Sequence, residues 1–294
     1  KGDCVYGVRL ADGSTLEATS VILACGHSAR EIYELFASKS WAIEAKPFAM
    51  GVRVEHSQEL INKVQYNSEH YSKLLPVASY SLTHNVGNRG VFSFCMCPGG
   101  MIIPSSTEEG QLVVNGMSSS LRNSQFANSG IVVSITEADA TKFASEGALS
   151  LMRFQQECER KMYIDKQIAP AQRIGDFMAN RTSQNLCRSS YPSGLHACNM
   201  NEFLPKIVSD TLQQGFAVFD RKIAGFVSND ALMIGLEART SSPVRIPRDK
   251  DSMQHLQLKN LYPCGEGAGY AGGITSSAID GVNAAIKIAE TLAQ

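Results

Sequence analysis

The sequence predicts an α/β domain into which a second, α+β domain is inserted. Two observations predict the α/β class: a short apolar strand runs into glycine and then a helix near the start of the chain, and the same order returns near its end. A third observation predicts the insertion, because several strands bounded by Gly, Pro and Asn lie between these two regions. The expected boundaries are 1–45 and 246–294 for the α/β domain and 46–245 for the inserted domain.

Residues 4–25 are expected to form a β-hairpin and a following strand. Asp12-Gly13 is a hairpin turn signal between two apolar runs. Val21–Cys25 is continuously apolar, which predicts a fully buried strand. The chain opens at Lys1, without an initiator Met and within this β-structure, so we expect it to be a piece of a longer protein.

The next element is a helix expected over residues 29–37. Ser28 is placed to cap it, with Glu31 completing a capping box. Ser28 also raises the alternative of a serine hydrolase, because it lies between a strand and a helix. The nucleophile elbow of α/β-hydrolases requires G-x-S-x-G, however, and Arg30 stands where the second glycine is needed.

The middle of the chain mixes strands and helices. Strands are expected at 48–56, 90–100, 101–106 and 110–118, and helices at 145–163 and 204–220. Pro205 lies near the start of the last helix, where proline is tolerated. These elements predict the α+β character of the insertion.

The end of the chain repeats the order of its beginning. A short apolar strand ends at "LYPCGEG" and a helix follows from Ile274. One helical face carries Ile274, Ala278, Val282, Ala285, Ile286, Ala289 and Leu292. A strand, glycine and helix at each end imply that the two ends pair in one sheet.

Composition excludes several classes of function. Hydrophobic residues make up 44% and charged residues 19% of the 294 residues, as in ordinary soluble globular proteins. A formal net charge of −1 argues against a nucleic-acid partner. No apolar run reaches the roughly 18 residues that span a bilayer, and no secretory signal is present. We therefore expect a cytoplasmic protein without a membrane partner, and the sequence leaves its oligomeric state open.

The eight cysteines do not predict a metal site or a disulfide framework. Their spacing is scattered, and the one close pair, Cys95 and Cys97, lacks a second pair with histidines nearby. Free thiols are expected for most of them. No metal is expected.

The loop before the last helix carries the strongest functional signal. Gly267, Gly269 and Gly272 satisfy G-x-G-x-x-G, but the dinucleotide fingerprint requires a further strand after its helix, and here the chain ends. Glycines before a helix still let backbone N–H groups approach a ligand closely, and the Glu266 carboxylate can accept hydrogen bonds from sugar hydroxyls. The alternative is a simple surface turn.

Six longer stretches are distinctive: "VILACGHSAREIYEL", "IEAKPFAMGVRVEH", "RGVFSFCMCPGGMIIPSSTEEGQLVVNGMS", "APAQRIGDF", "EARTSSPVRI" and "LYPCGEGAGYAGGITSSAIDG". Together they resemble one known family, the predicted FAD-dependent dehydrogenases of the two-dinucleotide-binding flavoprotein group. The resemblance implies an FAD/NAD(P)-binding, Rossmann-like α/β domain with FAD as cofactor. This domain would be incomplete at its N-terminus, because the family opens with a βαβ unit that is absent here.

The resemblance also implies site residues and an activity. FAD would be contacted by Gly26, Gly265, Glu266, Gly272, Gly273, Ile274 and Thr275. The implied function is a flavin-dependent oxidoreductase acting on a small-molecule substrate, with NAD(P)H as a candidate electron donor. A non-catalytic scaffold or binding module that keeps the flavoprotein fold is the alternative.

Cys97 and Arg245 are the catalytic candidates. A thiol beside a flavin can act as a redox partner or a base, although Cys97 also fits a buried strand that ends in a Pro-Gly turn. Arg245 belongs to "RTSSPVR", in which Arg239, Ser241, Ser242 and Arg245 can hold a carboxylate or phosphate. A solvated loop returning between domains is the alternative for this stretch.

Overall fold

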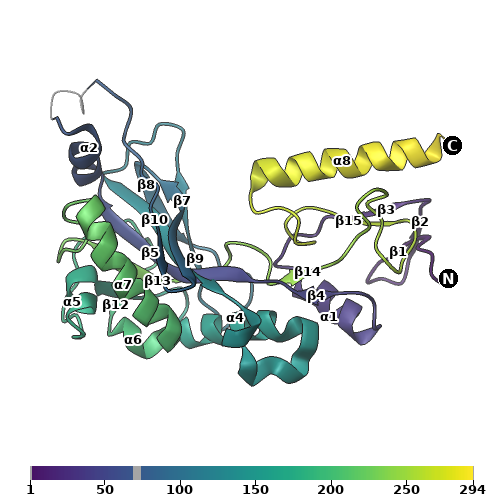
Figure 1. Ribbon diagram of the computed structural model, residues 1–294, viewed down its shortest axis with the longest axis horizontal. Helices are drawn as coiled ribbons and strands as arrows, with labels where there is room; N and C mark the ends of the chain where they lie inside the picture. Colours follow the sequence, from purple (N-terminus) through teal and green to yellow (C-terminus); the bar gives the residue numbers. More distant parts are fainter. Residues whose placement is uncertain (1, 69–73, 294) are drawn as a thin grey trace. The chain divides into compact units, whose positions relative to one another are not determined.

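The protein's structure, a computed structural model, describes residues 2–68 and 74–293 (Figure 1). The chain divides into two compact units. Unit 1 comprises Lys1–Phe48, Thr136–Phe154 and Ser241–Gln294, and unit 2 comprises Ala49–Ile135 and Gln155–Thr240. The segment 136–154, expected within the insertion, therefore clusters with the two ends of the chain.

Unit 1 is built from short strands and two longer helices. Its elements are β1 (Gly7–Arg9), β2 (Thr15–Glu17), β3 (Val21–Leu23), α1 (Arg30–Ser38), β4 (Glu44–Ala45), the 3₁₀ segments Glu137–Asp139 and Thr141–Leu149, β14 (Val244–Arg245), β15 (Leu261–Pro263) and α8 (Ile274–Leu292). β1 and β2 form the expected antiparallel hairpin. Its turn is held by the Asp12 carboxylate, which accepts hydrogen bonds from the backbone N–H and hydroxyl of Ser14.

The two ends of the chain pair in one sheet. β15 runs parallel to β3, with Leu261 opposite Val21 and Pro263 opposite Leu23, so the pairing expected from the sequence is confirmed. The expectation of a fully buried strand is wrong, because Ile22 is 42% exposed. Within the described residues β3 pairs with β15 alone, which leaves its other edge open.

The core of unit 1 lies between α1 and the loops that carry β14 and β15. Its buried apolar residues are Tyr33, Phe36, Leu149, Met152, Val244, Ile246, Leu258, Leu261 and Ala268. The Phe36 ring makes edge-to-face contacts with Trp41 and His255, at centroid distances of 5.3 and 5.5 Å. Such contacts between rings stabilise the core beyond the contribution of the buried apolar area.

The predicted capping of α1 is wrong. Ala29 is the N-cap residue, and no side chain accepts a hydrogen bond there. Ser28 lies one residue too early, where its carbonyl accepts the N–H of Arg30 at 2.9 Å and closes a turn. Sequence spacing identified the helix but not the turn that precedes it.

α8 buries a different face from the one that its apolar periodicity indicates. Asp280, Ala284 and Ile288 face the unit, and Ala284 packs in a small cluster with Tyr262 and Cys264. The predicted face is exposed, with Ile274 at 93% and Leu292 at 64% exposure. The helix is therefore apolar on both sides, a pattern typical of helices buried all round.

Unit 2 is built around one large sheet. Its elements are β5 (Phe48–Ser57), α2 (Gln58–Tyr66), β6 (Thr83–Val86), β7 (Arg89–Cys97), β8 (Gly100–Pro104), β9 (Val114–Ser118), β10 (Phe126–Ile135), α4 (Ser150–Met162), β11 (Ala169–Arg173), α5 (Ile174–Met178), β12 (Leu195–Ala197), α6 (Met200–Phe203), α7 (Lys206–Lys222) and β13 (Leu232–Glu237). β5 begins at one junction with unit 1, and α4 begins within unit 1 and crosses another. The expected helix at 145–163 is shorter, because residues 141–149 are 3₁₀ rather than α-helical.

The sheet of unit 2 is mostly antiparallel. Its seven strands run in the order β12-β11-β13-β5-β10-β7-β6, and β11 and β12 are parallel. β8 and β9 form a separate hairpin. Mixed α/β structure is thus confirmed, whereas the Rossmann-like fold of the other domain stays a prediction.

α7 packs against the β7 side of this sheet. Gly215 makes the close approach possible, because a Cβ atom there would lie 2.9 Å from both methyl groups of Val91. Phe216, Phe219 and Phe226 form a buried aromatic cluster next to it, with ring centroids 5.6 to 5.8 Å apart. This packing fixes the helix on the sheet.

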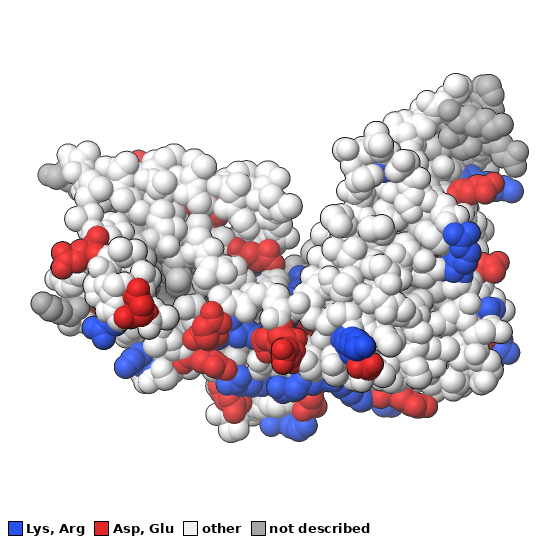
Figure 2. Space-filling model, turned by 180° about the vertical axis from the view of Figure 1, so that it is seen from behind, with Lys and Arg blue, Asp and Glu red and all other residues white. Residues whose placement is uncertain are grey.

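No helix among residues 2–68 and 74–293 is both long and apolar enough to cross a membrane. Figure 2 shows Lys and Arg side chains interspersed with Asp and Glu side chains on the face that it presents. The exclusion of a nucleic-acid partner stays a prediction.

Candidate functional site

The parallel pair of β3 and β15 brings two glycine loops together at the carboxyl ends of the strands. The N–H of Cys264 donates to the Leu23 carbonyl at 2.9 Å and continues the ladder into the loops. A Cβ atom on Gly267 would lie 2.6 Å from the carbonyl carbon and oxygen of Gly26. The backbones of the two loops are therefore in contact, and glycine at 267 is required for it.

Tyr33 of α1 locks the second loop in place. Its buried hydroxyl donates to the Gly267 carbonyl at 2.7 Å and lies 3.1 Å from Ser242 Oγ. Burial raises the pKa of Tyr33 well above its ordinary value, so the phenol stays a neutral donor. Ser242 in turn donates to the Val244 carbonyl. Its hydroxyl is thus engaged within the core rather than free to hold a ligand.

Glu266 lies beside the first loop. Its Oε1 is 2.7 Å from Nδ1 of His27, and both side chains are largely buried. The sequence singled out Glu266 but not His27. The signal for His27 was its place directly after Gly26, at the end of the strand that pairs with β15.

Arg248 and Asp280 form a second polar cluster that sequence reasoning missed. The guanidinium donates two hydrogen bonds to the carboxylate, at 2.9 and 2.6 Å, and a third to the Pro263 carbonyl at 2.7 Å. Asp280 also accepts the N–H of Gly265 at 2.8 Å. Burial alone would raise the pKa of Asp280, but the bonds from Arg248 and Gly265 lower it. This pair ties β15, the glycine loop and α8 together.

The aromatic ring of Tyr270 covers Arg248. The guanidinium lies 3.8 Å from the ring centroid, and the Tyr270 hydroxyl accepts the backbone N–H of Arg248 at 3.0 Å. Arg245 approaches the same ring, at 5.5 Å from the centroid. The loop 265–270 is therefore held by a cation–π contact at its end.

The predicted glycines before α8 have open space beside their Cα atoms. A Cβ atom at Gly272 would meet no atom within 4 Å, and one at Gly273 would meet only Ser276 Oγ at 3.9 Å. The Gly272 N–H donates to that hydroxyl at 3.4 Å. Ile274 and Thr275 are exposed at the first turn of α8. The structure thus brings Gly26, Gly265 and Glu266 into one region of unit 1 with the start of α8.

Arg245, predicted to be catalytic, lies on β14 in the same unit. Its Nε atom is buried and has no hydrogen-bond partner among the described residues. Arg239, which the sequence grouped with it, lies in unit 2 and forms an ion pair with the buried carboxylate of Glu159. The expected anion site in "RTSSPVR" is therefore not assembled from its own residues.

Cys97 lies in unit 2, at the end of β7, and is half-buried. Its Sγ is 3.8 Å from the guanidinium of Arg53, which is fully buried and pairs with Glu237 at 2.8 Å. Arg53 also donates to the Cys95 carbonyl and to the side-chain oxygen of Asn128. Burial raises the pKa of Glu237, while the Arg53 charge opposes this shift. A thiol therefore lies beside a cation that is held rigidly in the sheet.

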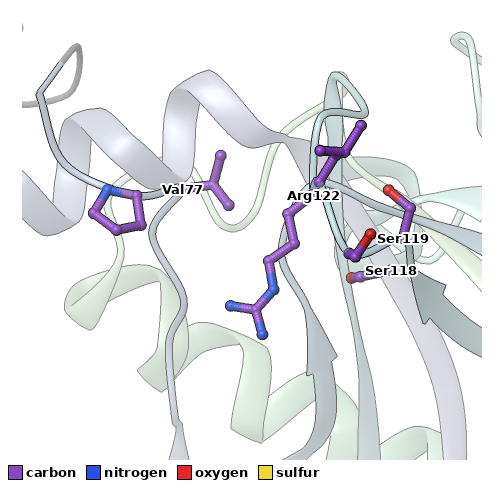
Figure 3. A pocket seen from close by; sticks show the side chains of 7 residues that line it. Val77, Ser118, Ser119 and Arg122 are labelled. Atoms are coloured by element: carbon purple, nitrogen blue, oxygen red, sulfur yellow. The ribbon is translucent and has the colours of Figure 1, made fainter.

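A shallow hollow of unit 2 lies next to the turn at Pro98-Gly99, which directly follows Cys97 (Figure 3). Its lining includes Val77 and the turn from Ser118 to Arg122. Figure 3 shows the side chains of Val77, Ser118 and Arg122. The backbone of Arg122 packs against Gly99, where a Cβ atom would lie 1.9 Å from its carbonyl oxygen. The turn that follows Cys97 thus packs, through Gly99, against a residue that lines the hollow.

Ser28 does not form a nucleophile elbow. Arg30, which replaces the required glycine, is buried at the first position of α1. The adjacent His27 points to Glu266 instead.

Comparison with known proteins identifies the family. A profile described as "FAD-dependent protein, C-terminal domain-like" matches residues 47–240, more than half of the chain. The chain belongs to this family. An uncharacterized protein of Clostridium beijerinckii is 42% identical over 288 residues, which cover 96% of the chain and 53% of the relative. The chain thus spans about half the length of that relative.

The range matched by the FAD-dependent family covers unit 2 and the segment 136–154 inserted between its parts. The glycine loops, Glu266 and the Arg248–Asp280 pair lie in unit 1, outside that range. The match to the relative extends over them, because it covers nearly the whole chain.

Proposed function

We propose that the protein is a flavin-dependent oxidoreductase, an FAD-dependent dehydrogenase acting on a small-molecule substrate. Membership of an FAD-dependent family is the observation that carries this proposal. The open glycine loop before α8 supports it, because such loops let a cofactor approach the backbone. NAD(P)H is the proposed electron donor and the cytoplasm the proposed location.

The residues of unit 1 fit the chemistry of FAD. The Glu266 carboxylate is placed to accept hydrogen bonds from the ribityl or ribose hydroxyls. Backbone N–H groups of Gly273, Ile274 and Thr275, at the start of α8, favour the diphosphate or the pyrimidine edge of the flavin. The first loop, at Gly26, would pass near the adenosine half.

The chain's own residues would position the substrate and a proton. When bound, FAD accepts or donates a hydride, which is the redox step of such enzymes. Arg245 is proposed to orient an anionic group of the substrate. Cys97 is proposed to act as a redox partner or a base, because its sulfur lies 3.8 Å from the guanidinium of Arg53.

A further segment of the full-length protein is proposed to complete unit 1. The relative is about twice as long as the part matched here. The open edge of β3 and the exposed apolar face of α8 are surfaces that such a segment would cover. We propose that it carries the nucleotide-binding βαβ unit and lies next to β3.

The loop assignment is tested on flavin retention. In the full-length protein, Glu266→Ala removes the carboxylate, and we expect the purified protein to hold FAD about tenfold more weakly because a charge-assisted hydrogen bond is lost. Glu290→Ala is the control, since Glu290 pairs with Lys287 on the distal part of α8. The bound flavin is first removed, and the apoprotein is then titrated with FAD while fluorescence is recorded. Equal affinity of the two variants would contradict the assignment of Glu266.

A further inference from the structure

Lys46 and Arg245 lie next to each other in unit 1. β14 pairs antiparallel with β4, and the N–H of Lys46 donates to the Pro243 carbonyl at 2.9 Å directly after this pair. A Cβ atom on Gly269 would lie 3.1 Å from both Lys46 Cδ and Arg245 Cα. The glycine loop therefore packs onto both basic residues at one point.

Neither cation has an anionic partner at contact distance. Among the residues that the structure describes, no Asp or Glu oxygen lies within 4.0 Å of Lys46 Nζ or of the Arg245 guanidinium. The two other half-buried arginines of unit 1, Arg248 and Arg153, are both paired with carboxylates. Arg245 Nε is buried without a hydrogen-bond partner, which is costly unless a ligand satisfies it.

The surroundings favour an oxyanion between the two cations. Burial and the charge of Arg245 lower the pKa of Lys46, while the charge of Glu266 raises it. Glu266 itself lies 2.7 Å from His27. The Tyr270 ring lies 5.5 Å from the Arg245 guanidinium and forms an apolar wall beside it. Two neighbouring cations without carboxylate partners in a half-buried place are typical of carboxylate and phosphate sites.

We propose that Lys46 and Arg245 together bind an oxyanion, the carboxylate of the substrate or a phosphate group of the cofactor. The inference extends the proposed flavin site and rests on that proposal only for the identity of the neighbouring cofactor. Lys46 takes the place that sequence reasoning gave to Arg239 and Ser242. Arg239 is held by Glu159, and Ser242 is engaged in the core.

The test measures anion binding to the full-length protein by isothermal titration with inorganic phosphate and with acetate. We expect Lys46→Gln and Arg245→Gln each to weaken binding about tenfold or more, because each removes a charge-assisted hydrogen bond. Lys39→Gln is the matched control, since Lys39 is exposed at the end of α1 and its loss changes the net charge equally. Lys46→Arg keeps the charge and should retain binding, which separates anion binding from a loss of folding.

Equal affinity of Lys46→Gln, Arg245→Gln and Lys39→Gln would overturn the proposal, as would the absence of phosphate and acetate binding to the unaltered protein. FAD and riboflavin titrations distinguish the two sources of the oxyanion. If the Lys46 and Arg245 variants bind FAD more weakly but riboflavin as before, the pair binds the cofactor phosphates. If only their affinity for acetate falls, the pair binds the carboxylate of the substrate. The full-length protein could also retain no flavin and yet bind phosphate more weakly in Lys46→Gln and Arg245→Gln than in Lys39→Gln. That result would support this inference and refute the proposed function.

Discussion

His56 shows how one buried residue makes stability depend on pH. It lies on β5 among Phe226 and its neighbours, and its Nε2 is 2.9 Å from the Phe226 carbonyl. Burial lowers the pKa of His56 to about 4. The folded protein therefore keeps the ring neutral in mild acid, where the unfolded chain binds a proton.

We expect the free energy of unfolding to fall on acidification from about pH 6.5 to about pH 4. His56 should account for up to about 3 kcal/mol of this fall. The free energy falls rather than rises because the pKa of His56 is lower in the folded protein, so the unfolded chain binds more protons between these two pH values. His56→Gln should reduce this dependence, whereas His196→Gln, at an exposed position on β12, should leave it as it is. Urea unfolding at several pH values measures it, and identical slopes for the two variants would contradict the account.

Asp280 in unit 1 also makes the stability of the folded protein depend on pH, here through a carboxyl group. Asp280→Asn removes a carboxylate that accepts hydrogen bonds from Arg248 and Gly265, so we expect the free energy of unfolding at neutral pH to fall by about 2–3 kcal/mol. Because the folded pKa of Asp280 is lowered, its contribution is present above the ordinary pKa of a carboxyl and is lost as the pH falls through the folded value. The difference between variant and unaltered protein should therefore shrink in acid.

Chemical denaturation of the full-length protein at neutral and acidic pH measures this difference. Glu290→Gln serves as a control, because its pair with Lys287 is exposed and should contribute little. A difference that does not change with pH would show that Asp280 acts through packing alone.

At the scale of elements, α8 carries an apolar face that unit 1 leaves exposed. In the full-length protein we expect Val282→Glu and Ile286→Glu to lower the midpoint of thermal unfolding, because each would place an unpaired charge under the proposed covering segment. Leu121→Glu is the control on an exposed turn of unit 2, where 77% of the residue's surface is accessible. Midpoints for the α8 variants that equal that of Leu121→Glu would mean that this face is solvent-exposed in the whole protein.

The elements that could be predicted were those with local signals. Strand, glycine and helix at each end follow from apolar runs and glycine positions, and the pairing of the two ends in one sheet follows from their repetition. The side of α8 that is buried could not be read from its sequence, because periodicity reports an apolar face and not which neighbour covers it. β10 was missed for a related reason. Its Asn128, Ser129 and Gly130 interrupt the apolar pattern where a bulge shifts the register against β7.

Most of the site's polar contacts lay beyond sequence reasoning. Arg248 and Asp280 are separated by 32 residues, and Arg53 and Glu237 by 184, so only the fold brings each pair together. Glu266 and the glycines were found because their signal is local to one loop. Lys46 gave no signal, since its relation to Arg245 depends on the pairing of β4 with β14.

For the molecule as a whole, the family and the site lie in different parts of the chain. The FAD-dependent family match covers unit 2 together with the segment 136–154, and the loops proposed to contact FAD lie in unit 1. The relative extends over both and beyond them. The proposed enzyme is therefore the full-length protein, and the residues of this chain that are proposed to contact FAD lie in unit 1.

Under the proposed function, this protein binds FAD and uses it in redox chemistry. The most direct measurement is the visible absorbance of the purified full-length protein before and after anaerobic addition of NADH or NADPH. We predict the yellow spectrum of a bound flavin that bleaches on reduction and returns when air is admitted. A folded, colourless full-length protein that cannot be reconstituted with FAD would contradict the claim and favour the non-catalytic scaffold.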